Sequence, residues 1–182
     1  MTKLGNLKPS GVWRYFEEIT KIPRPSKQEE KMIAYVIDFA KSHNLSFTKD
    51  ATGNVLIRKP ATSGYEKRQT VCLQSHLDMV CEKNSNSLHN FETDPIRMVV
   101  DDEWIKAEDT TLGADNGIGM AAQLAILADS KAKHGPIECL FTIDEETGLN
   151  GAMGLESNFF DAKILLNLDS EDEGELFIGC AG

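Results

Sequence analysis

One histidine and several acidic residues follow three apolar runs of the sequence, and their types and spacing suit metal chemistry. His76 and Asp78 lie near the end of TVCLQSHLDMV, Asp144 to Glu146 follow IECLFTI, and Asp169 follows KILLNL. Apolar runs of this kind are typical of buried strands in a parallel sheet. Because ligands of open α/β sheets bind beyond the carboxyl ends of the strands, we expect these side chains to converge on one crevice.

His76 and Asp78 are two residues apart, so in an extended strand both side chains point to the same face. A carboxylate in that position can orient the imidazole, as it commonly does for zinc-bound histidines. A histidine taken alone is more often a hydrogen-bonded structural residue. The acidic residues at the other strand ends favour the metal-ligand interpretation of His76.

Asp115 lies in LGADNG, just before the apolar segment IGMAAQLAILADS. Asp, Asn and Gly are common in helix caps and turns, and a cap alone would account for the motif. A carboxylate facing the strand ends could instead bridge two metal ions about 3.5 to 4 Å apart, as dinuclear hydrolases require. Both interpretations stay open at this point.

Asp144, Glu145 and Glu146 form an acidic run directly after a predicted buried strand. Most acidic runs are solvated surface, but three adjacent carboxylates repel one another, and a nearby divalent cation would offset that repulsion. We expect Glu146 to bind metal and Glu145 to face the attacking water. Asp169 is a further expected ligand, although Asn167 makes the end of its strand less clean. Zinc suits these ligand types, and manganese or cobalt would also be accepted.

Hydrophobic periodicity indicates the elements that must position these residues. Residues 11–21 have the apolar spacing of a helix, which the prolines of IPRPS end. Ser26 and Glu29 form a capping-box pattern that predicts a second helix over KMIAYVIDFAKSH. SFTKD and NVLIRKP predict two short strands around a turn at Gly53.

Further along the chain, predicted strands and helices alternate. IRMVVDDEWIKAE predicts a hairpin turning at Asp101 and Asp102, IGMAAQLAILADS a helix lying on a sheet, and IECLFTI and KILLNL two buried strands. This β-α-β-α-β order predicts an α/β fold, a mostly parallel sheet flanked by helices. The sequence ends in ELFIGCAG, which we expect to lie in or just after another strand, so we expect a truncated fold.

The composition narrows the functional classes. With 182 residues and 41% hydrophobic content, the chain can bury one sizeable core, which favours a single domain. A net charge of −10 opposes binding to nucleic acid or to an anionic membrane surface. No stretch approaches the roughly 18 to 20 apolar residues of a membrane-spanning helix, so we expect a soluble cytoplasmic protein.

The four cysteines are scattered without a C-x-x-C pair, which argues against a zinc ribbon or a redox dithiol. Cys72 and Cys139 lie inside apolar runs, and we expect reduced, mostly buried thiols of the kind found in cytosolic proteins. The remaining histidines are expected to be structural or exposed: His43, His89 and His134.

SHLDMV, TTLGADNGIGMA, TIDEETG and NLDSEDEGELFIGCAG together resemble the M20-type zinc metallopeptidases, and most closely their aminoacyl-histidine (Xaa-His) dipeptidase branch. The resemblance covers nearly the whole chain, and IPRPS, IRKPAT and HGPIE also resemble that branch. It implies zinc-dependent hydrolysis of short peptides, with Xaa-His dipeptides as the expected substrates. A tripeptidase or an N-acyl amino acid deacylase would use the same metal chemistry, and a non-catalytic metal-binding module is a further alternative.

The same resemblance implies the metal ligands. His76 and Asp169 would complete one zinc site with a bridging Asp115, and Glu146 would share the second zinc with Asp115. Asp78 would orient His76 and belongs with the catalytic residues.

The resemblance also makes Glu145 the general base, which takes a proton from the metal-bridging water and delivers it to the leaving amine. Enzymes of this family carry a further histidine ligand for the second zinc, together with a lid and dimerisation domain. Neither lies within residues 1–182. We therefore expect residues 1–182 to be the N-terminal part of a single catalytic domain, inactive alone, from a protein that forms homodimers.

Overall fold

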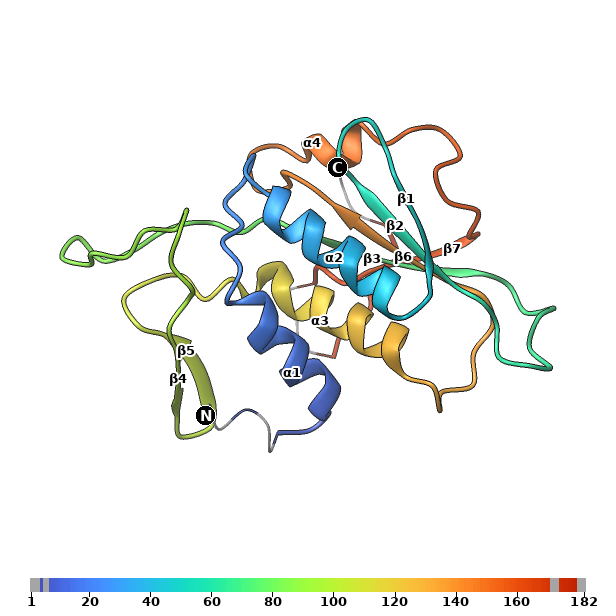
Figure 1. Ribbon diagram of the computed structural model, residues 1–182, viewed down its shortest axis with the longest axis horizontal. Helices are drawn as coiled ribbons and strands as arrows, with labels where there is room; N and C mark the ends of the chain where they lie inside the picture. Colours follow the sequence, from blue (N-terminus) through green and yellow to red (C-terminus); the bar gives the residue numbers. More distant parts are fainter. Residues whose placement is uncertain (1–3, 5–6, 171–173, 180–182) are drawn as a thin grey trace.

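The computed structural model describes residues 4, 7–170 and 174–179, whose arrangement is drawn in Figure 1. In chain order the elements are α1 (Ser10–Ile19), α2 (Glu30–Ser42), β1 (Ser46–Lys49), β2 (Val55–Lys59), β3 (Val71–His76), β4 (Met98–Asp101), β5 (Trp104–Ala107), α3 (Ala114–Ala128), β6 (Ile137–Thr142), α4 (Asn150–Met153) and β7 (Ile164–Asn167). The alternation of β3, α3, β6, α4 and β7 agrees with the predicted order.

Five strands form one sheet in the order β1-β2-β6-β3-β7. β3 runs parallel to β6 and β7, whereas β2 is antiparallel to β1 and β6, so β1, β6, β3 and β7 share one direction. The register places His76 opposite Thr142 and Gln74 opposite Asn167. The carboxyl ends of β3, β6 and β7 therefore meet at one edge, which confirms the predicted mostly parallel α/β sheet.

Helices α2 and α3 lie against one face of the sheet, and α1 packs beside α3 (Figure 1). Their apolar residues recur at helical spacing and pack into the core, where Phe16, Met32, Met120 and Leu124 are at most 1% exposed. Burial of each such side chain contributes about 1.5–3 kcal/mol. This core holds α3, the helix that begins beside Asp115, against β3.

A buried polar contact fixes the position of α3 along β3. The Gln123 side chain accepts a hydrogen bond from Ser75 Oγ and donates to the carbonyls of Leu73 (2.7 Å) and Leu140 (3.2 Å). Gln123 is fully buried, so an unpaired amide there would cost about 1–3 kcal/mol. Sliding α3 over the sheet would break these bonds, and the contact therefore keeps the start of α3 beside the end of β3.

The opposite face and the outer edge of the sheet are less covered. A small apolar cluster around Leu56 and Leu140 fills part of that face. Three residues of the edge strand β7 are 40–47% exposed: Ile164, Leu165 and Leu166. Apolar side chains at this exposure form a surface that further protein could cover.

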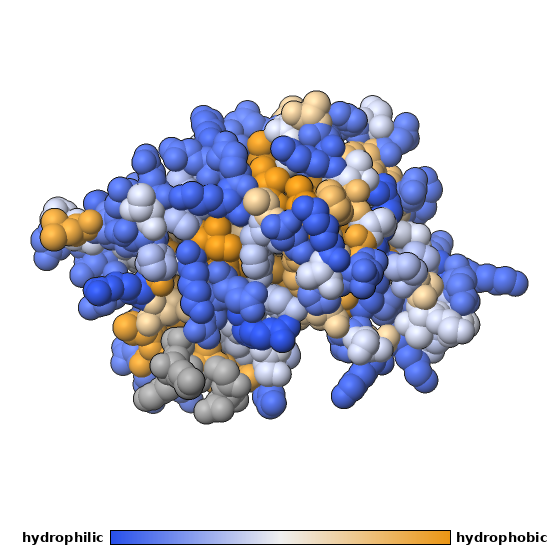
Figure 2. Space-filling view, viewed as in Figure 1, coloured by the Kyte–Doolittle hydropathy of each residue, from blue (hydrophilic) through white to orange (hydrophobic). Residues whose placement is uncertain are grey.

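The predicted β4–β5 hairpin is confirmed as a separate two-stranded sheet. Asp102 adopts a left-handed φ of 55° at its turn, and Asp101 forms an ion pair of 2.6 Å with Lys106. Trp104 on this hairpin is 70% exposed. The face seen in Figure 2 is largely hydrophilic, with apolar residues showing at its centre and beside the hairpin at lower left.

The cysteines agree with the sequence analysis where they are described. Cys72 and Cys139 are free and fully buried, and Cys81 is free and partly buried. Burial raises the pKa of the Cys72 thiol to about 12. Cys180 lies outside the described residues.

Across the described part of the chain, no helix combines the length and the apolar character needed to cross a bilayer.

We expected ELFIGCAG to lie in or just after another strand, and its described residues do not lie in one. Residues 174–179 contain no strand, and residues 180–182 lie outside the description. Leu176 and Ile178 are 96% and 102% exposed, so these two apolar side chains are not covered by the described residues.

The predicted capping box at the start of α2 is also wrong, because no side-chain cap hydrogen bond forms there. Ser26 Oγ donates instead to Asp78 Oδ2 at 2.7 Å, and Glu29 Oε1 accepts the N–H of Asp144 at 3.0 Å. A carboxylate is a stronger acceptor partner for a hydroxyl than a neutral group. The tertiary contact with Asp78 therefore takes the place of the local cap.

Candidate metal centre

The imidazole of His76 lies at the centre of the candidate site, at the carboxyl end of β3. Its side chain is 1% exposed, and Nδ1 is 3.2 Å from Asp78 Oδ1. On the other side, Nε2 lies 2.9 Å from Asp115 Oδ1 and 3.7 Å from Asp169 Oδ2. The fold thus brings together four residues that the sequence analysis selected, from the end of β3, the start of α3 and the segment after β7.

The carboxylates around His76 create a strongly negative environment. Burial lowers the pKa of His76, but hydrogen bonds with Asp78 and Asp115 outweigh that effect and raise the pKa to about 9. The surroundings of this imidazole therefore favour a positive charge, whether it is carried by a proton or by a metal ion.

Asp78 is a fully buried acceptor shared by three segments of the chain. Oδ2 accepts hydrogen bonds from Ser26 Oγ (2.7 Å) and the Glu146 N–H (3.2 Å), and Oδ1 accepts one from the Glu145 N–H (3.0 Å). Burial raises the pKa of Asp78, but the hydrogen bonds it accepts, that of His76 foremost, hold the pKa well below its usual range. An ionised Asp78 consequently ties His76 to the loop after β6.

Asp115 departs from helical geometry at the beginning of α3. Its φ and ψ are −78° and 116°, Gly113 two residues earlier is left-handed with φ of 70°, and no side-chain hydrogen bond caps the helix. The Asp115 carboxylate lies against His76 instead, and the side chain is 64% exposed. No hydrogen bond therefore supports the interpretation of Asp115 as a helix cap. Its carboxylate is accessible to a ligand that arrives from solvent.

The three adjacent carboxylates after β6 have different surroundings, beginning with Asp144. Its side chain is buried and accepts hydrogen bonds from Thr147 Oγ1 (2.6 Å) and Asn150 Nδ2 (2.7 Å) at the start of α4. Asp144 therefore stabilises local structure. Glu145 and Glu146 are the two carboxylates of this run that are left as candidates for metal binding or catalysis.

Glu146 joins a group that can hold a metal ion. Ligand atoms of His76, Asp115 and Glu146 all lie within 4.8 Å of one another. Burial raises the pKa of Glu146, and the nearby charge of Asp115 adds to the effect. Burial also raises the pKa of Asp169 to about 6, with the His76 charge opposing it. A divalent cation would stabilise these crowded carboxylates in their ionised form, and one imidazole with several carboxylates fits zinc, manganese or cobalt.

Glu145 lies beside this group without belonging to it among the described residues. It lines a pocket of about 240 Å³ together with Asp169, Thr142 and apolar side chains that include Phe160. Its backbone is held by the 3.0 Å hydrogen bond to Asp78. The structure thus places a carboxylate next to the candidate ligands on a backbone that is fixed.

The burial of two charged residues near the site was not predicted by the sequence analysis. Glu29 is 3% exposed and forms a second close group of carboxylates with Asp78 and Asp144, satisfied by the hydrogen-bond donors described above. Arg24 is 2% exposed and donates to backbone carbonyls at the end of β3 and before α3. Both lie in the proline-containing connection between α1 and α2, where neither the motif IPRPS nor the capping-box pattern shows that these charges are buried.

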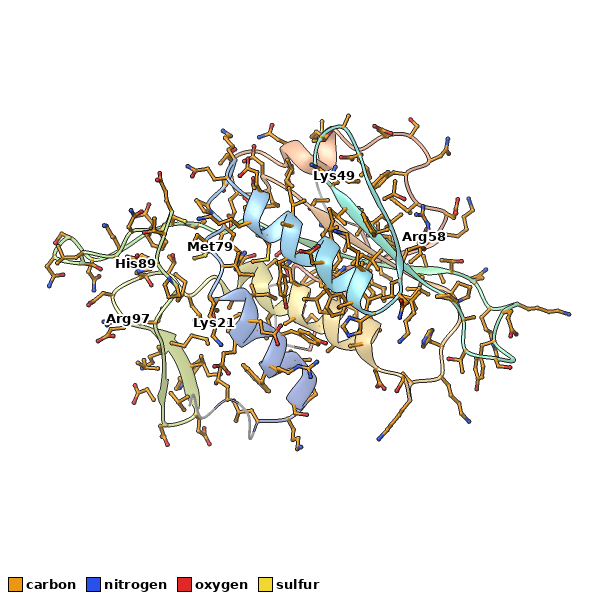
Figure 3. The ribbon with its side chains drawn as sticks, in the orientation of Figure 1. Lys21, Lys49, Arg58, Met79, His89 and Arg97 are labelled. Carbon is orange, nitrogen blue, oxygen red and sulfur yellow. The ribbon has the colours of Figure 1, made fainter. Side chains whose placement is uncertain are left out.

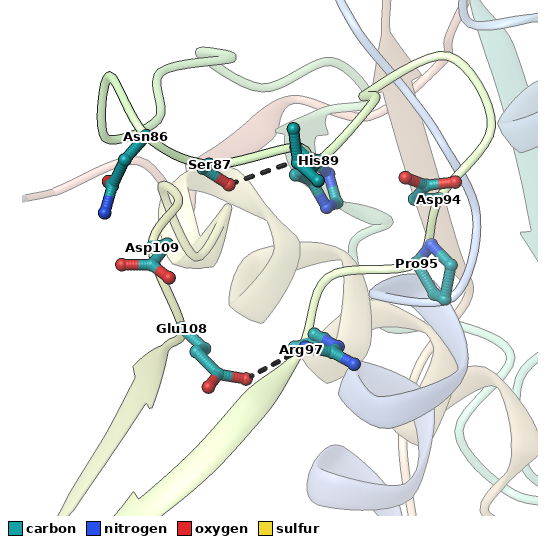
Figure 4. Close-up of a pocket in the computed structure, with 9 residues that line it drawn as sticks. Asn86, Ser87, His89, Asp94, Pro95, Arg97, Glu108 and Asp109 are labelled. Atoms are coloured by element: carbon teal, nitrogen blue, oxygen red, sulfur yellow. Dashed lines mark hydrogen bonds and ion pairs between the residues drawn. The ribbon is translucent and has the colours of Figure 1, made fainter.

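Two of the other histidines, His43 and His134, make local contacts that agree with the predicted structural role. His43 Nδ1 lies 2.9 Å from the Phe39 carbonyl, and His134 Nδ1 bonds to the next carbonyl along the chain at 2.7 Å. His89 lies out on the long polar loop, away from Met79 (Figure 3). It lines a separate pocket of about 480 Å³, drawn in Figure 4, to which none of the candidate metal ligands contributes.

Comparison with known proteins identifies the family to which the chain belongs. Residues 72–179 match the model of peptidase family M20/M25/M40. The chain is 52% identical over all 182 residues to the cytosol non-specific dipeptidase of Escherichia coli. Its structure matches an aminoacylhistidine dipeptidase from Vibrio alginolyticus with a TM-score of 0.96 and 50% identity over 98% of the chain. A tripeptidase from Staphylococcus aureus shares the fold over 89% of this chain and 43% of its own, with a TM-score of 0.75 and 23% identity.

The chain spans 38% of the length of the E. coli relative and 36% of the V. alginolyticus protein. The family match covers more than half of the chain and includes all the candidate ligands at the strand ends. The resemblance found in the sequence motifs is therefore confirmed, and the chain belongs to peptidase family M20/M25/M40.

Proposed function

We propose that this chain is the N-terminal part of the catalytic domain of a metal-dependent dipeptidase. The observation that carries the proposal is the group of His76, Asp115 and Glu146, whose ligand atoms lie within 4.8 Å of one another. Asp169, 3.7 Å from His76, adds a fourth donor. Two relatives that match the chain over nearly its whole length are named as dipeptidases, which supports peptide hydrolysis.

The proposed metal sites share one carboxylate. His76, Asp115 and Asp169 would hold one zinc ion, and Asp115 with Glu146 would contribute to the second. The bridging role of Asp115 is supported by its contacts with both His76 and the Glu146 group. Bound zinc would polarise the substrate carbonyl and lower the pKa of water toward neutrality. Manganese or cobalt would suit the same donors.

Glu145 would act as the general base. It neighbours Glu146, stands outside the metal-competent group, and is held by Asp78 through its N–H. From there its carboxylate would accept a proton from the attacking water and pass it to the leaving amine of the peptide. Asp78 would keep the His76 imidazole oriented through the 3.2 Å contact with Nδ1.

The proposed substrates are short unblocked peptides, with dipeptides ending in histidine foremost. The name of the V. alginolyticus protein supports this choice, whereas the E. coli relative is named a non-specific dipeptidase. A tripeptidase is the second candidate, because a solved structure that shares the fold of this chain is named a tripeptidase. Both candidates use the same proposed metal chemistry.

A substrate panel with the complete protein tests this proposal. The panel contains Xaa-His dipeptides, other dipeptides, tripeptides and N-acyl amino acids, each assayed before chelation, after chelation and after zinc is restored. We expect Xaa-His dipeptides to be hydrolysed fastest, and the activity to disappear with the chelator and return with zinc. Faster cleavage of tripeptides would support the second candidate, and activity that survives thorough chelation would contradict the metal site itself.

We also propose that the complete protein adds a lid and dimerisation domain and a further histidine ligand, and acts as a cytoplasmic homodimer. The share of the relatives' length that the chain spans supports this, as does the exposed apolar surface of β7 at Ile164 to Leu166. The buried free thiols and the name of the E. coli relative support the compartment. Light scattering on the complete protein would measure its oligomeric state.

A further inference from the structure

Arg24 is a buried cation whose hydrogen bonds, within the described part of the chain, all go to backbone carbonyls. Its side chain lies in a residue that is 2% exposed. Nη1 donates to the carbonyls of Leu77 (2.9 Å) and Asp78, and Nη2 donates to the carbonyl of Gly113. One guanidinium therefore joins the segment after β3 to the segment before α3.

These two segments carry the contact at the heart of the candidate site. Leu77 and Asp78 directly follow His76, and Gly113 is two residues before Asp115. His76 Nε2 and Asp115 Oδ1 lie 2.9 Å apart. Arg24 therefore bonds to the backbone on both sides of this pair and limits how far the two ligands can separate.

Two glycines at the start of α3 leave space for the Arg24 guanidinium. A Cβ atom added at Gly113 would lie 2.6 Å from Arg24 Nη2, and one added at Gly117 would lie 2.9 Å from it. Gly113 also has a φ of 70°, which disfavours other residues. Glycine at these two positions lets the backbone approach the cation closely enough for the Gly113 carbonyl to accept its hydrogen bond.

The charge of Arg24 matches its surroundings. Burial lowers the pKa of Arg24 to about 10, while Asp78, Asp115 and Glu146 act in the opposite direction. The guanidinium therefore stays protonated at neutral pH. A buried cation is tolerated when hydrogen bonds and opposite charges compensate its desolvation, and here carboxylates of the candidate metal site supply part of that compensation.

We propose that Arg24 is a positioning residue that sets the spacing of His76 and Asp115 and thereby the affinity of the site for zinc. It acts through the backbone of the two ligand segments and touches neither the ion nor the substrate. The inference rests on the proposed function, because it assigns these two residues to a shared ion. Lysine cannot replace arginine here, since an ammonium is a point donor and cannot span the two segments as the planar guanidinium does.

The test compares Arg24→Lys with Arg58→Lys in the complete protein. Arg58 is the matched control because it is partly buried, donates to the Phe159 carbonyl at 3.1 Å and pairs with Glu138, which lies at the end of β6 opposite to the candidate ligands. Zinc affinity is measured by competition with a chromophoric chelator, and urea unfolding of the metal-free protein measures stability separately. We expect the zinc dissociation constant to rise at least 10-fold in Arg24→Lys and less than 2-fold in Arg58→Lys.

A second variant separates positioning from a general loss of structure. In Arg24→Ala, free ethylguanidinium at millimolar concentration should occupy the vacated space and lower the zinc dissociation constant again, while it leaves Arg58→Ala unchanged. Unchanged zinc affinity in Arg24→Lys would overturn the positioning role and leave the proposed function standing. A wild-type protein that binds no zinc would overturn the proposed function, and this inference with it.

Discussion

Asp78 offers the sharpest test of how the candidate site is held together. Its carboxylate meets four donors: His76 Nδ1 and the Glu145 N–H at Oδ1, and Ser26 Oγ and the Glu146 N–H at Oδ2. Replacing Asp78 with asparagine keeps the shape of the side chain but removes its charge and one acceptor oxygen. The substitution therefore isolates the electrostatic and hydrogen-bonding contribution from packing.

The magnitude follows from these contacts. The asparagine carbonyl can serve both donors at Oδ1, while its NH₂ group would face Ser26 and the Glu146 N–H. The Ser26 hydroxyl can rotate and accept, but the N–H loses its acceptor, which costs about 1–3 kcal/mol in a buried site. Loss of charge assistance in the remaining bonds adds about 1 kcal/mol. We expect the free energy of unfolding to fall by about 2–4 kcal/mol, and the zinc affinity to fall by about 10- to 100-fold because His76 loses its orienting carboxylate.

Two measurements on the complete protein check this prediction. Urea unfolding of the metal-free protein gives the stability change, and chelator competition gives the zinc dissociation constant. The control is Asp38→Asn, because the Asp38 side chain is 71% exposed and its 2.8 Å ion pair with Lys41 lies on the surface of α2. That substitution should change stability by less than about 0.5 kcal/mol. Wild-type zinc affinity in Asp78→Asn would refute the idea that this carboxylate prepares the His76 ligand.

Three further predictions concern the complete protein and its isolated N-terminal part. Glu145→Gln should retain its metal content by atomic emission and lose peptide turnover, and near wild-type turnover would contradict its role as base. His76→Ala should lose mainly one metal ion and Asp115→Ala both, whereas full occupancy in the Asp115 variant would rule out a shared ligand. Isolated residues 1–182 should bind at most one zinc ion tightly by calorimetry and show negligible hydrolysis of an Xaa-His dipeptide, because the second ion would have Asp115 and Glu146 alone. Two tight sites with robust hydrolysis would show that this ligand count is mistaken.

The candidate ligands could be found from sequence because two local signals coincide at them. His76 and Asp169 each follow an apolar run, and both runs form strands, β3 and β7. Residue type and strand position are both readable from neighbouring residues. The order of the strands in the sheet could not be predicted in this way. β6 lies between β2 and β3, and no local sequence pattern contains information about which strands pair.

Ser26 and Arg24 show why the rest of the site was not predictable. Ser26 has the local pattern of a helix cap, yet its hydroxyl bonds to Asp78, 52 residues away. Arg24 looks like an ordinary charged residue in a loop, yet its partners lie 53 and 89 residues away at Leu77 and Gly113. Local sequence patterns reflect hydrogen bonding between neighbouring residues. At Ser26 and Arg24, residues far away in the sequence provide the hydrogen-bond partners instead.

The sequence separation of these contacts also determines when the site can exist. Asp78 reaches the Glu145 N–H across 67 residues, and Arg24 reaches Gly113 across 89. Contacts between distant segments carry the entropy of closing long loops and form slowly during folding. A nascent chain must extend past Glu146 before Asp78 can meet its backbone donors, and past Asp169 before the last candidate ligand is present. During synthesis, the complete set of candidate ligands is therefore present only once Asp169 has been added to the chain.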